Sequence, residues 1–246
     1  MMLDDKQALI SKLKKDLLSW QGVAQSLNDE CAIDLGPLEK AFPNGIFPKG
    51  VIHEFVSFNR MDSAASCGFI GALLGKLMQN DGICIWIGSI QTVFPAAIKS
   101  FGVDPASIVF VSMKRERDVL WAMEEALKCH GITAVLAEIH QLDFIQSRRL
   151  QLAVEKSRVT GFILQHTPKI LLATSCAARW KVTSLPSQSD DGLPGIGYPC
   201  WEVELLKVRN GNPAKGQIIW SPQGFRTFLK KDVQITDWTY NYQNLG

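Results

Sequence analysis

Residues 51–79 read VIHEFVSFNRMDSAASCGFIGALLGKLMQ, which is a strand pattern followed directly by a helix pattern. The first part, 51–57, is an apolar run of strand length, and 63–79 mixes apolar and small residues as a buried helix does. Further strand-like runs rich in Val and Ile alternate with helical patterns downstream. Strands joined by helices run parallel, because each connection crosses back to the same end of the sheet. The sequence therefore predicts an α/β fold with a largely parallel sheet flanked by helices.

Apolar runs and helical patterns also give the order of the elements. Predicted strands of the parallel region cover 51–57, 83–87, 108–111, 133–139 and 161–165, and predicted helices cover 63–79, 94–101, 117–129 and 144–158. From residue 169 the runs are all strand-like, at 170–174, 179–185, 201–209 and 217–220, with a hairpin signal at 210–213. We therefore expect C-terminal antiparallel strands to extend the sheet. The Gly- and Pro-rich residues 36–50 predict turns around a short helix, and 184–199 predict a mobile loop.

Three parts are expected along the chain. Residues 1–30 contain an amphipathic helix at 7–20, which either packs on the body or serves as a docking arm for another subunit. Residues 31–224 form the core domain, and residues 225–246 form a C-terminal tail. The sequence has no visible internal repeat.

Composition and charge exclude few functions. The 246 residues include 26 Lys and Arg against 24 Asp and Glu, and this net charge of +2 neither indicates nor excludes nucleic acid. No apolar stretch reaches the roughly 20 residues of a membrane helix, and the N-terminus lacks an apolar signal core, so a cytoplasmic protein is predicted. The six cysteines are scattered without a CxxC pair, which predicts reduced thiols, no metal site and no cofactor.

Over about residues 30–222 the sequence resembles the RecA core. Residues 33–55, IDLGPLEKAFPNGIFPKGVIHEF, are similar to the stretch that leads RecA proteins into their first core strand. GICIWI (82–87) and GITAVLAEI (131–139) fall at the second strand and at the Walker B strand. Within this group the chain resembles the ImuA family in five segments that occur in the same order: GVIHEF (50–55), AASCGF (64–69), SRRLQLA (147–153), AARWKV (177–182) and WEVELLKVRNG (201–211).

A phosphate loop is missing between the first strand and its helix. Such a loop needs G-x-x-x-x-G-K-[ST], because glycines let backbone amides close on the phosphates, the lysine neutralises charge and the hydroxyl holds Mg²⁺. The join at 57–64 contains no glycine and no lysine; Phe58 and Met61 are expected to crowd a phosphate and Asp62 to repel it. The positions of the degenerate nucleotide site are Ser57, Arg60, Asp62, Ser63 and Glu138.

The other nucleotide-handling positions point the same way. Glu138 falls where the resemblance places the Mg²⁺-linked aspartate, but it has no phosphate partner with which to share a metal. Residues 88–91, where RecA proteins carry a water-orienting glutamate, contain no carboxylate. We expect no ATPase activity; an atypical ATPase built on Arg60 and Glu138 is the alternative. His140 and His166 could join Glu138 in a hydrolytic cluster, although hydrogen-bonded structural histidines are the more common outcome.

The C-terminal half carries basic residues interleaved with aromatic ones. The candidates for binding nucleic acid or a protein are Arg179, Lys181, Lys207, Arg209 and Lys215, and the aromatic residues among them are Trp180, Trp201, Trp220 and Phe225. Such a pattern binds single strands by phosphate neutralisation and base stacking, and it also occurs on ordinary antiparallel faces with half-buried tryptophans. The resemblance implies that Lys207 and Arg209 fall where RecA-like proteins place a basic pair that reaches the nucleotide of the next subunit.

Several functions follow from the resemblance as expectations. The interval after the fifth strand, 167–169, is expected to be too short for the second DNA-binding loop of RecA proteins. The ImuA resemblance implies a non-enzymatic accessory protein of SOS translesion mutagenesis. It would bind an ImuB-like inactive relative of the Y-family polymerases, with RecA and a mutagenic replicative-type polymerase as further partners. The alternatives are a single-stranded-DNA-binding module without ATPase activity and a cell-division inhibitor of the SulA kind, which also resembles a RecA core without a phosphate loop.

Overall fold

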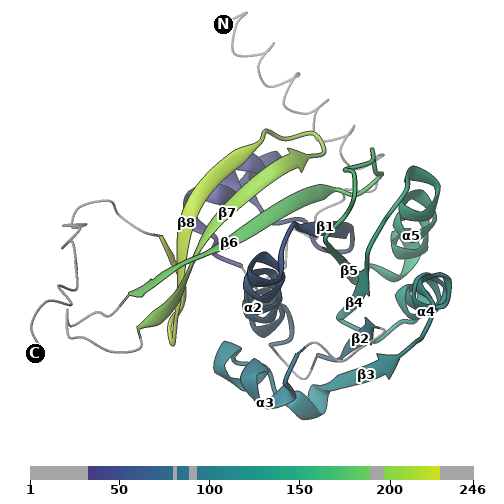
Figure 1. The fold of residues 1–246 in the computed structure, drawn as a ribbon, viewed down its shortest axis with the longest axis horizontal. Helices are drawn as coiled ribbons and strands as arrows, with labels where there is room; N and C mark the ends of the chain where they lie inside the picture. The colour runs from purple at the N-terminus through teal and green to yellow at the C-terminus, as the bar shows by residue number, and fades with distance from the viewer. Residues whose placement is uncertain (1–32, 80–81, 89–92, 189–196, 228–246) are drawn as a thin grey trace, which may run out of the picture.

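β1 (Ile52–Ser57) lies inside a sheet that contains nine strands in the described part of the chain (Figure 1). The computed structural model describes residues 33–79, 82–88, 93–188 and 197–227. The strand order is β3-β2-β4-β5-β1-β6-β7-β8-β9, and the neighbouring strands from β3 to β6 run parallel. β7, β8 and β9 continue the sheet by antiparallel pairing. The predicted α/β fold, with a largely parallel sheet extended by antiparallel strands, is therefore confirmed.

The elements occur in the predicted order along the chain. The parallel strands are β1, β2 (Cys84–Gly88), β3 (Ile108–Ser112), β4 (Ala134–Ile139), β5 (Thr160–His166) and β6 (Ala178–Gln188). The α-helices between them are α2 (Arg60–Leu77), α3 (Pro95–Ile98), α4 (Glu116–Lys128) and α5 (Phe144–Ser157). The antiparallel strands are β7 (Tyr198–Val208), β8 (Ala214–Ser221) and β9 (Gly224–Thr227). Short 3₁₀ helices at Gly36–Ala41 and Pro43–Gly45 occupy the Gly- and Pro-rich segment before β1.

The strand predicted at 170–174 is wrong. These residues form no strand, and the whole of 167–177 connects β5 to β6. β1 already pairs with β5 on one side and with β6 on the other, so the run meets no open strand edge there. The backbone carbonyl of Leu172 instead accepts a hydrogen bond from the Arg179 side chain, at 2.5 Å. Local apolarity predicted a strand, but the pairing that a strand needs was not available.

Other predicted boundaries also shift. Residues 184–188 and 198–199 belong to β6 and β7 rather than to a loop, because the two strands pair as far as Gln188 and Tyr198. β9 has no counterpart in the prediction, and it places Phe225 in the core although the tail was expected to begin at residue 225. The helix predicted at 7–20 lies outside the described residues.

One face of the sheet is covered by α2 and holds an aromatic core. Trp180 and Phe55 are fully buried, and their rings stack with centroids 5.5 Å apart and planes 2° apart. Phe69 of α2 lies 5.9 Å from Trp180 and 5.6 Å from Trp201 between ring centroids. Phe225 joins the same cluster from β9. Because large rings bury the most apolar area per residue, this cluster fixes the antiparallel strands against α2.

The opposite face of the sheet is covered by α4 and α5. Met123 of α4 and Leu150 of α5 are buried in one cluster with Val135 and Ile163 of the parallel strands. Both faces of these strands are therefore buried, which explains why the strands are continuous apolar runs rather than alternating ones. In the described residues, no helix combines the length and the apolarity that crossing a bilayer requires.

Stability is expected to fall in mild acid because His53 is buried in a neutral form. Trp180 Nε1 can only donate, and it lies 3.2 Å from His53 Nδ1, so His53 Nε2 carries the proton and donates to the Pro48 carbonyl at 2.8 Å. Burial lowers the pKa of His53 from 6.5 to about 4. The unfolded chain therefore binds a proton below about pH 6.5 that the folded chain binds only near pH 4.

The free energy of unfolding should accordingly decrease by about 2 kcal/mol between about pH 7.5 and pH 5 through this group. Urea unfolding at both pH values, in the natural protein and in His53→Gln, measures the difference that belongs to His53. Equal pH dependence of the unfolding free energy in the two proteins would show that protonation of His53 does not destabilise the fold.

Candidate functional site

The carboxyl ends of the parallel strands bring the predicted nucleotide-site residues to one edge of the sheet, where α/β proteins usually bind ligands. β1 ends at Ser57 and β5 ends at its register partner His166. Glu138 lies one residue before the end of β4, the strand on the other side of β5. Ser63 lies in the first turns of α2, directly after β1. Ser57, Ser63, Glu138 and His166 therefore lie at the same edge of the sheet.

The connection from β1 to α2 consists of only two residues, Phe58 and Asn59. Asn59 is the N-cap of the helix: its Oδ1 accepts the amide of Asp62 at 2.8 Å and its carbonyl accepts the amide of Ser63 at 3.1 Å. Its Nδ2 also donates to Asp62 Oδ2 at 2.9 Å. A phosphate bound at a helix N-terminus uses amides of this kind. Here the Asn59 side chain accepts the hydrogen bond of one such amide, that of Asp62, and the join has no glycine or lysine with which to form a phosphate cradle.

The remaining side chains of the join do not enclose a ligand. Arg60 is exposed at the first position of α2. Phe58 and Met61 are 46% and 70% exposed, so they lie at the surface instead of crowding the site as expected. Ser57 is fully buried, and its Oγ lies 3.1 Å from Ser66 Oγ.

A chain of side-chain hydrogen bonds occupies the space between α2, β4 and β5. Ser63 Oγ lies 3.0 Å from His166 Nδ1, and His166 Nε2 lies 2.9 Å from Glu138 Oε2. The indole of Trp86 in β2 donates to Glu138 Oε1 at 2.6 Å. Glu138 thus contacts a histidine and accepts a hydrogen bond from a tryptophan. His140 turns away to Glu116, at 2.6 Å, and does not join the group.

The order hydroxyl, imidazole, carboxylate also occurs where a serine acts as a nucleophile. Acyl transfer needs in addition preorganised donors that bind the oxyanion of the intermediate. The amides of Asp62 and Ser63, at the start of α2, both donate to Asn59. The described contacts thus form a hydrogen-bonded network of Ser63, His166, Glu138 and Trp86 at the carboxyl edge of the sheet.

A second polar cluster lies beside the first, around the fully buried carboxylate of Glu54 in β1. Arg179 of β6 donates to it from Nε at 2.9 Å and from Nη2 at 3.1 Å. Thr174 Oγ1 donates to Glu54 Oε2 at 2.6 Å, and Gln165 Nε2 donates to Oε1. The ion pair and these hydrogen bonds satisfy a charge that would otherwise be costly to bury.

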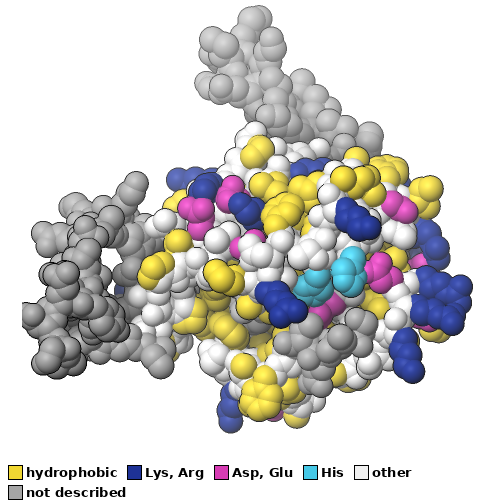
Figure 2. All heavy atoms as spheres, in the orientation of Figure 1, with side chains coloured by type: hydrophobic (Ala, Val, Ile, Leu, Met, Phe, Trp, Pro, Cys, Tyr) yellow, Lys and Arg dark blue, Asp and Glu magenta, His cyan; other side chains and the backbone are white. Residues whose placement is uncertain are grey.

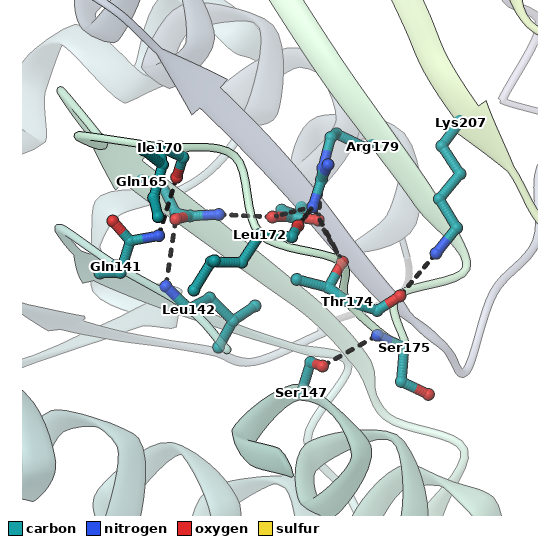
Figure 3. Close-up of polar contacts among 11 residues, drawn as sticks. Gln141, Leu142, Ser147, Gln165, Ile170, Leu172, Thr174, Ser175, Arg179 and Lys207 are labelled. Atoms are coloured by element: carbon teal, nitrogen blue, oxygen red, sulfur yellow. Dashed lines mark hydrogen bonds and ion pairs between the residues drawn. The ribbon is translucent and has the colours of Figure 1, made fainter. Parts of the chain in front are cut away.

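The same cluster fastens the connection 167–177, as Figure 3 shows for the side chains around Thr174 and Leu172. Lys207 Nζ donates to the Thr174 carbonyl at 2.5 Å, and Arg209 donates to the Ser175 carbonyl. The Ser175 amide donates to Ser147 Oγ at 2.9 Å. Of the predicted basic residues, Arg179, Lys207 and Arg209 therefore hold a loop of their own chain.

The expectation of a very short interval after β5 is wrong. It rested on a strand at 170–174, and that strand is absent. The connection extends from 167 to 177, so the argument from length against a second loop no longer holds.

The other predicted basic residues pair with acidic neighbours on the antiparallel strands. Lys181 Nζ lies 3.1 Å from Glu204 Oε1, and Lys215 Nζ lies 2.7 Å from Glu202 Oε1. The hydrogen bond from Lys181 lowers the pKa of Glu204, and the hydrogen bond to Glu202 raises the pKa of Lys215. The aromatic residues between them, Trp180, Trp201, Trp220 and Phe225, are all buried in the core. These rings therefore present no face on which a base could stack.

Sequence reasoning missed the Glu54 cluster and the role of Asn59. A signal for the first exists, because His53 and Glu54 interrupt an otherwise apolar strand, and a charged residue in such a run needs a buried partner. Nothing in local spacing identifies that partner as Arg179, which lies 125 positions away. Asn59, followed three residues later by Asp62, carries a recognisable N-cap signal.

Together, the parallel sheet, the helix directly after β1 and the antiparallel extension define an α/β fold of the RecA-like class. The chain is 29% identical over 188 residues to the protein named ImuA in two strains of Caulobacter vibrioides. The match covers 72% of this chain and 77% of those proteins. No protein-family model matches the sequence. This similarity agrees with the ImuA-like segments of the sequence and supports membership of the ImuA family.

Proposed function

We propose that this protein is a non-enzymatic accessory protein of damage-induced SOS translesion mutagenesis. It acts by protein–protein contact with an ImuB-like inactive relative of the Y-family polymerases. RecA and a mutagenic replicative-type polymerase are further proposed partners. The observation that carries this proposal is the similarity to ImuA over 188 residues, which spans most of the core.

The geometry of the degenerate site supports a role without ATP hydrolysis. Phosphoryl transfer depends on positioned cations and amides around the phosphates. The two-residue connection between β1 and α2 leaves no loop that could wrap around a phosphate. The Asn59 side chain also accepts a hydrogen bond from the Asp62 amide at the start of α2. Glu138, which the resemblance aligns with a metal-linked carboxylate, accepts a hydrogen bond from Trp86 Nε1 and lies within hydrogen-bond distance of His166 Nε2.

The surroundings of the basic residues favour a protein partner over a single strand of DNA. Stacking needs accessible aromatic faces, and the tryptophans among the basic residues are buried. Phosphate neutralisation needs free cations, whereas Lys181 and Lys215 pair with Glu204 and Glu202.

Calorimetric titration with the purified ImuB-like protein of the same organism tests the proposal. We expect binding with a Kd on the order of 1 µM or tighter. Mg²⁺·ATP should change the Kd by less than about twofold, because a ligand without a site shifts no equilibrium. Arg60→Ala, which removes the cation of an atypical ATPase, should also leave the Kd unchanged.

Two results would contradict the proposal. Binding that requires Mg²⁺·ATP and is lost in Arg60→Ala would restore the ATPase alternative. Absence of binding, combined with a steep salt-dependent affinity for single-stranded DNA, would favour the DNA-binding module.

A further inference from the structure

Two adjacent connections at the carboxyl edge of the sheet expose large apolar side chains. Phe144 and Ile145, at the start of α5, are 56% and 72% exposed. Ile170 and Leu171, in the connection from β5 to β6, are 61% and 42% exposed. None of these residues is needed to close the core, so their exposure requires another explanation.

The two connections form one surface because β4 and β5 are neighbouring strands. Gln141, just before α5, donates from Nε2 to the Ile170 carbonyl at 2.9 Å (Figure 3). In Figure 2, hydrophobic side chains gather at the upper right, over the region where the β5–β6 connection and α5 lie in Figure 1. We name this surface the edge patch, and its members are Phe144, Ile145, Arg148, Lys169, Ile170 and Leu171.

The edge patch is held in place before any partner binds. The connection that carries Ile170 and Leu171 is fastened by Arg179 at Leu172 and by Lys207 at Thr174. The start of α5 is fixed by a capping box, in which Asp143 accepts the Gln146 amide and Gln146 accepts the Asp143 amide. A surface that is already ordered loses little conformational entropy on binding, which favours affinity.

The charge of the edge patch selects its partner. Arg148 and Lys169 are exposed beside the apolar side chains. The segments 140–149 and 167–177 contain one acidic residue, Asp143, and its side chain is used to cap α5. We infer that the edge patch binds an acidic amphipathic segment of a partner protein. The apolar side chains of that segment contact Ile145, Ile170 and Leu171. Its carboxylates pair with Arg148 and Lys169.

Other occupants fit the patch less well. The amphipathic segment 7–20 of this chain, or of a second copy, carries Lys12, Lys14 and Lys15 and would bring like charges together. A single-stranded nucleic acid needs aromatic rings for base stacking in addition to basic residues, and three of the four apolar members are aliphatic. The inference rests on the proposed function only in that both assume a protein partner.

Site-specific photocrosslinking tests the occupant directly. The full chain, with Leu171 replaced by p-benzoylphenylalanine, is irradiated in cells after DNA damage, and the crosslinked peptide is sequenced by mass spectrometry. The matched control carries the probe at Val109, which is 51% exposed on β3. We expect an adduct at position 171 with an acidic segment whose apolar residues recur at helical spacing. This adduct should disappear when Arg148→Glu and Lys169→Glu are added. No adduct above the Val109 control, an adduct with nucleic acid, or an adduct with a segment without acidic residues would overturn the inference.

A second measurement separates this inference from the proposed function. The variant with Arg148→Glu and Lys169→Glu is titrated against the ImuB-like protein, and Arg117→Glu, also exposed, serves as the control. We expect the double variant to bind about tenfold more weakly or worse and the control to bind normally. Equal binding by the natural protein, the double variant and the control would contradict the inference about the edge patch but not the proposed partner. An acidic adduct at position 171 in a protein other than the ImuB-like one would support the patch and contradict the proposed partner.

Discussion

Replacement of Arg179 by alanine is expected to lower the free energy of unfolding by about 3–5 kcal/mol. Arg179 supplies two of the hydrogen bonds to Glu54, a carboxylate that is fully buried. Removal of the guanidinium leaves the buried charge without its counter-ion and with only the hydrogen bonds from Gln165 and Thr174, which is the costly case for a buried ion pair. The variant also loses the hydrogen bond to the Leu172 carbonyl, so the connection 167–177 should open first. Urea unfolding measures the loss, and hydrogen exchange of 167–177 measures the opening.

Lys181→Ala is the matched control, because Lys181 lies on the same strand and pairs with Glu204 near the surface. It should cost less than about 1 kcal/mol. Adding Glu54→Gln to Arg179→Ala should recover part of the stability, since the buried charge is then removed as well. A loss in Arg179→Ala as small as that in Lys181→Ala would show that Glu54 is not held as a buried charge.

Replacement of Trp180 by alanine is expected to cost about 3–5 kcal/mol of unfolding free energy. The indole is fully buried against Phe55 and Phe69, and neighbouring side chains cannot fill a cavity of that size. The substitution also removes the indole N–H that donates a hydrogen bond to His53 Nδ1. Thermal or urea unfolding followed by circular dichroism is the measurement.

The same substitution at Trp121 provides the comparison, because this tryptophan is 60% exposed on α4. Trp121→Ala should change the stability by less than about 0.5 kcal/mol. The pair distinguishes a core tryptophan from a surface ring. If Trp180→Ala were as stable as Trp121→Ala but bound single-stranded DNA more weakly, Trp180 would be a stacking residue after all.

The degenerate site and the edge patch lie at the same end of the parallel strands. His166 closes the Ser63–Glu138 network, and the connection with Ile170 and Leu171 begins at the next residue, Thr167. The edge at which parallel α/β sheets usually bind ligands thus carries both a network of internal hydrogen bonds and a set of exposed apolar side chains.

The sequence by itself determined the class of fold and the absence of a phosphate-loop motif from residues 57–64. Both depend on local features: the alternation of buried strands with helices, and the absence of glycine and lysine from residues 57–64. The family resemblance also rests on short local segments, which the match to ImuA supports. Local patterns of this kind are visible in a linear chain because the residues that create them are neighbours.

The tertiary structure decided the rest. Residues 170–174 have the apolarity of a strand, but they form a loop because β6 takes the pairing edge of β1 and Arg179 binds the Leu172 carbonyl. Trp180 and its aromatic neighbours alternate with basic residues as a binding surface would, yet α2 covers them. Partners such as Ser63 with His166 and Glu54 with Arg179 are joined by strand pairing across more than a hundred positions. Hydrogen-bond partners and burial are properties of that packing, so local spacing could not reveal them.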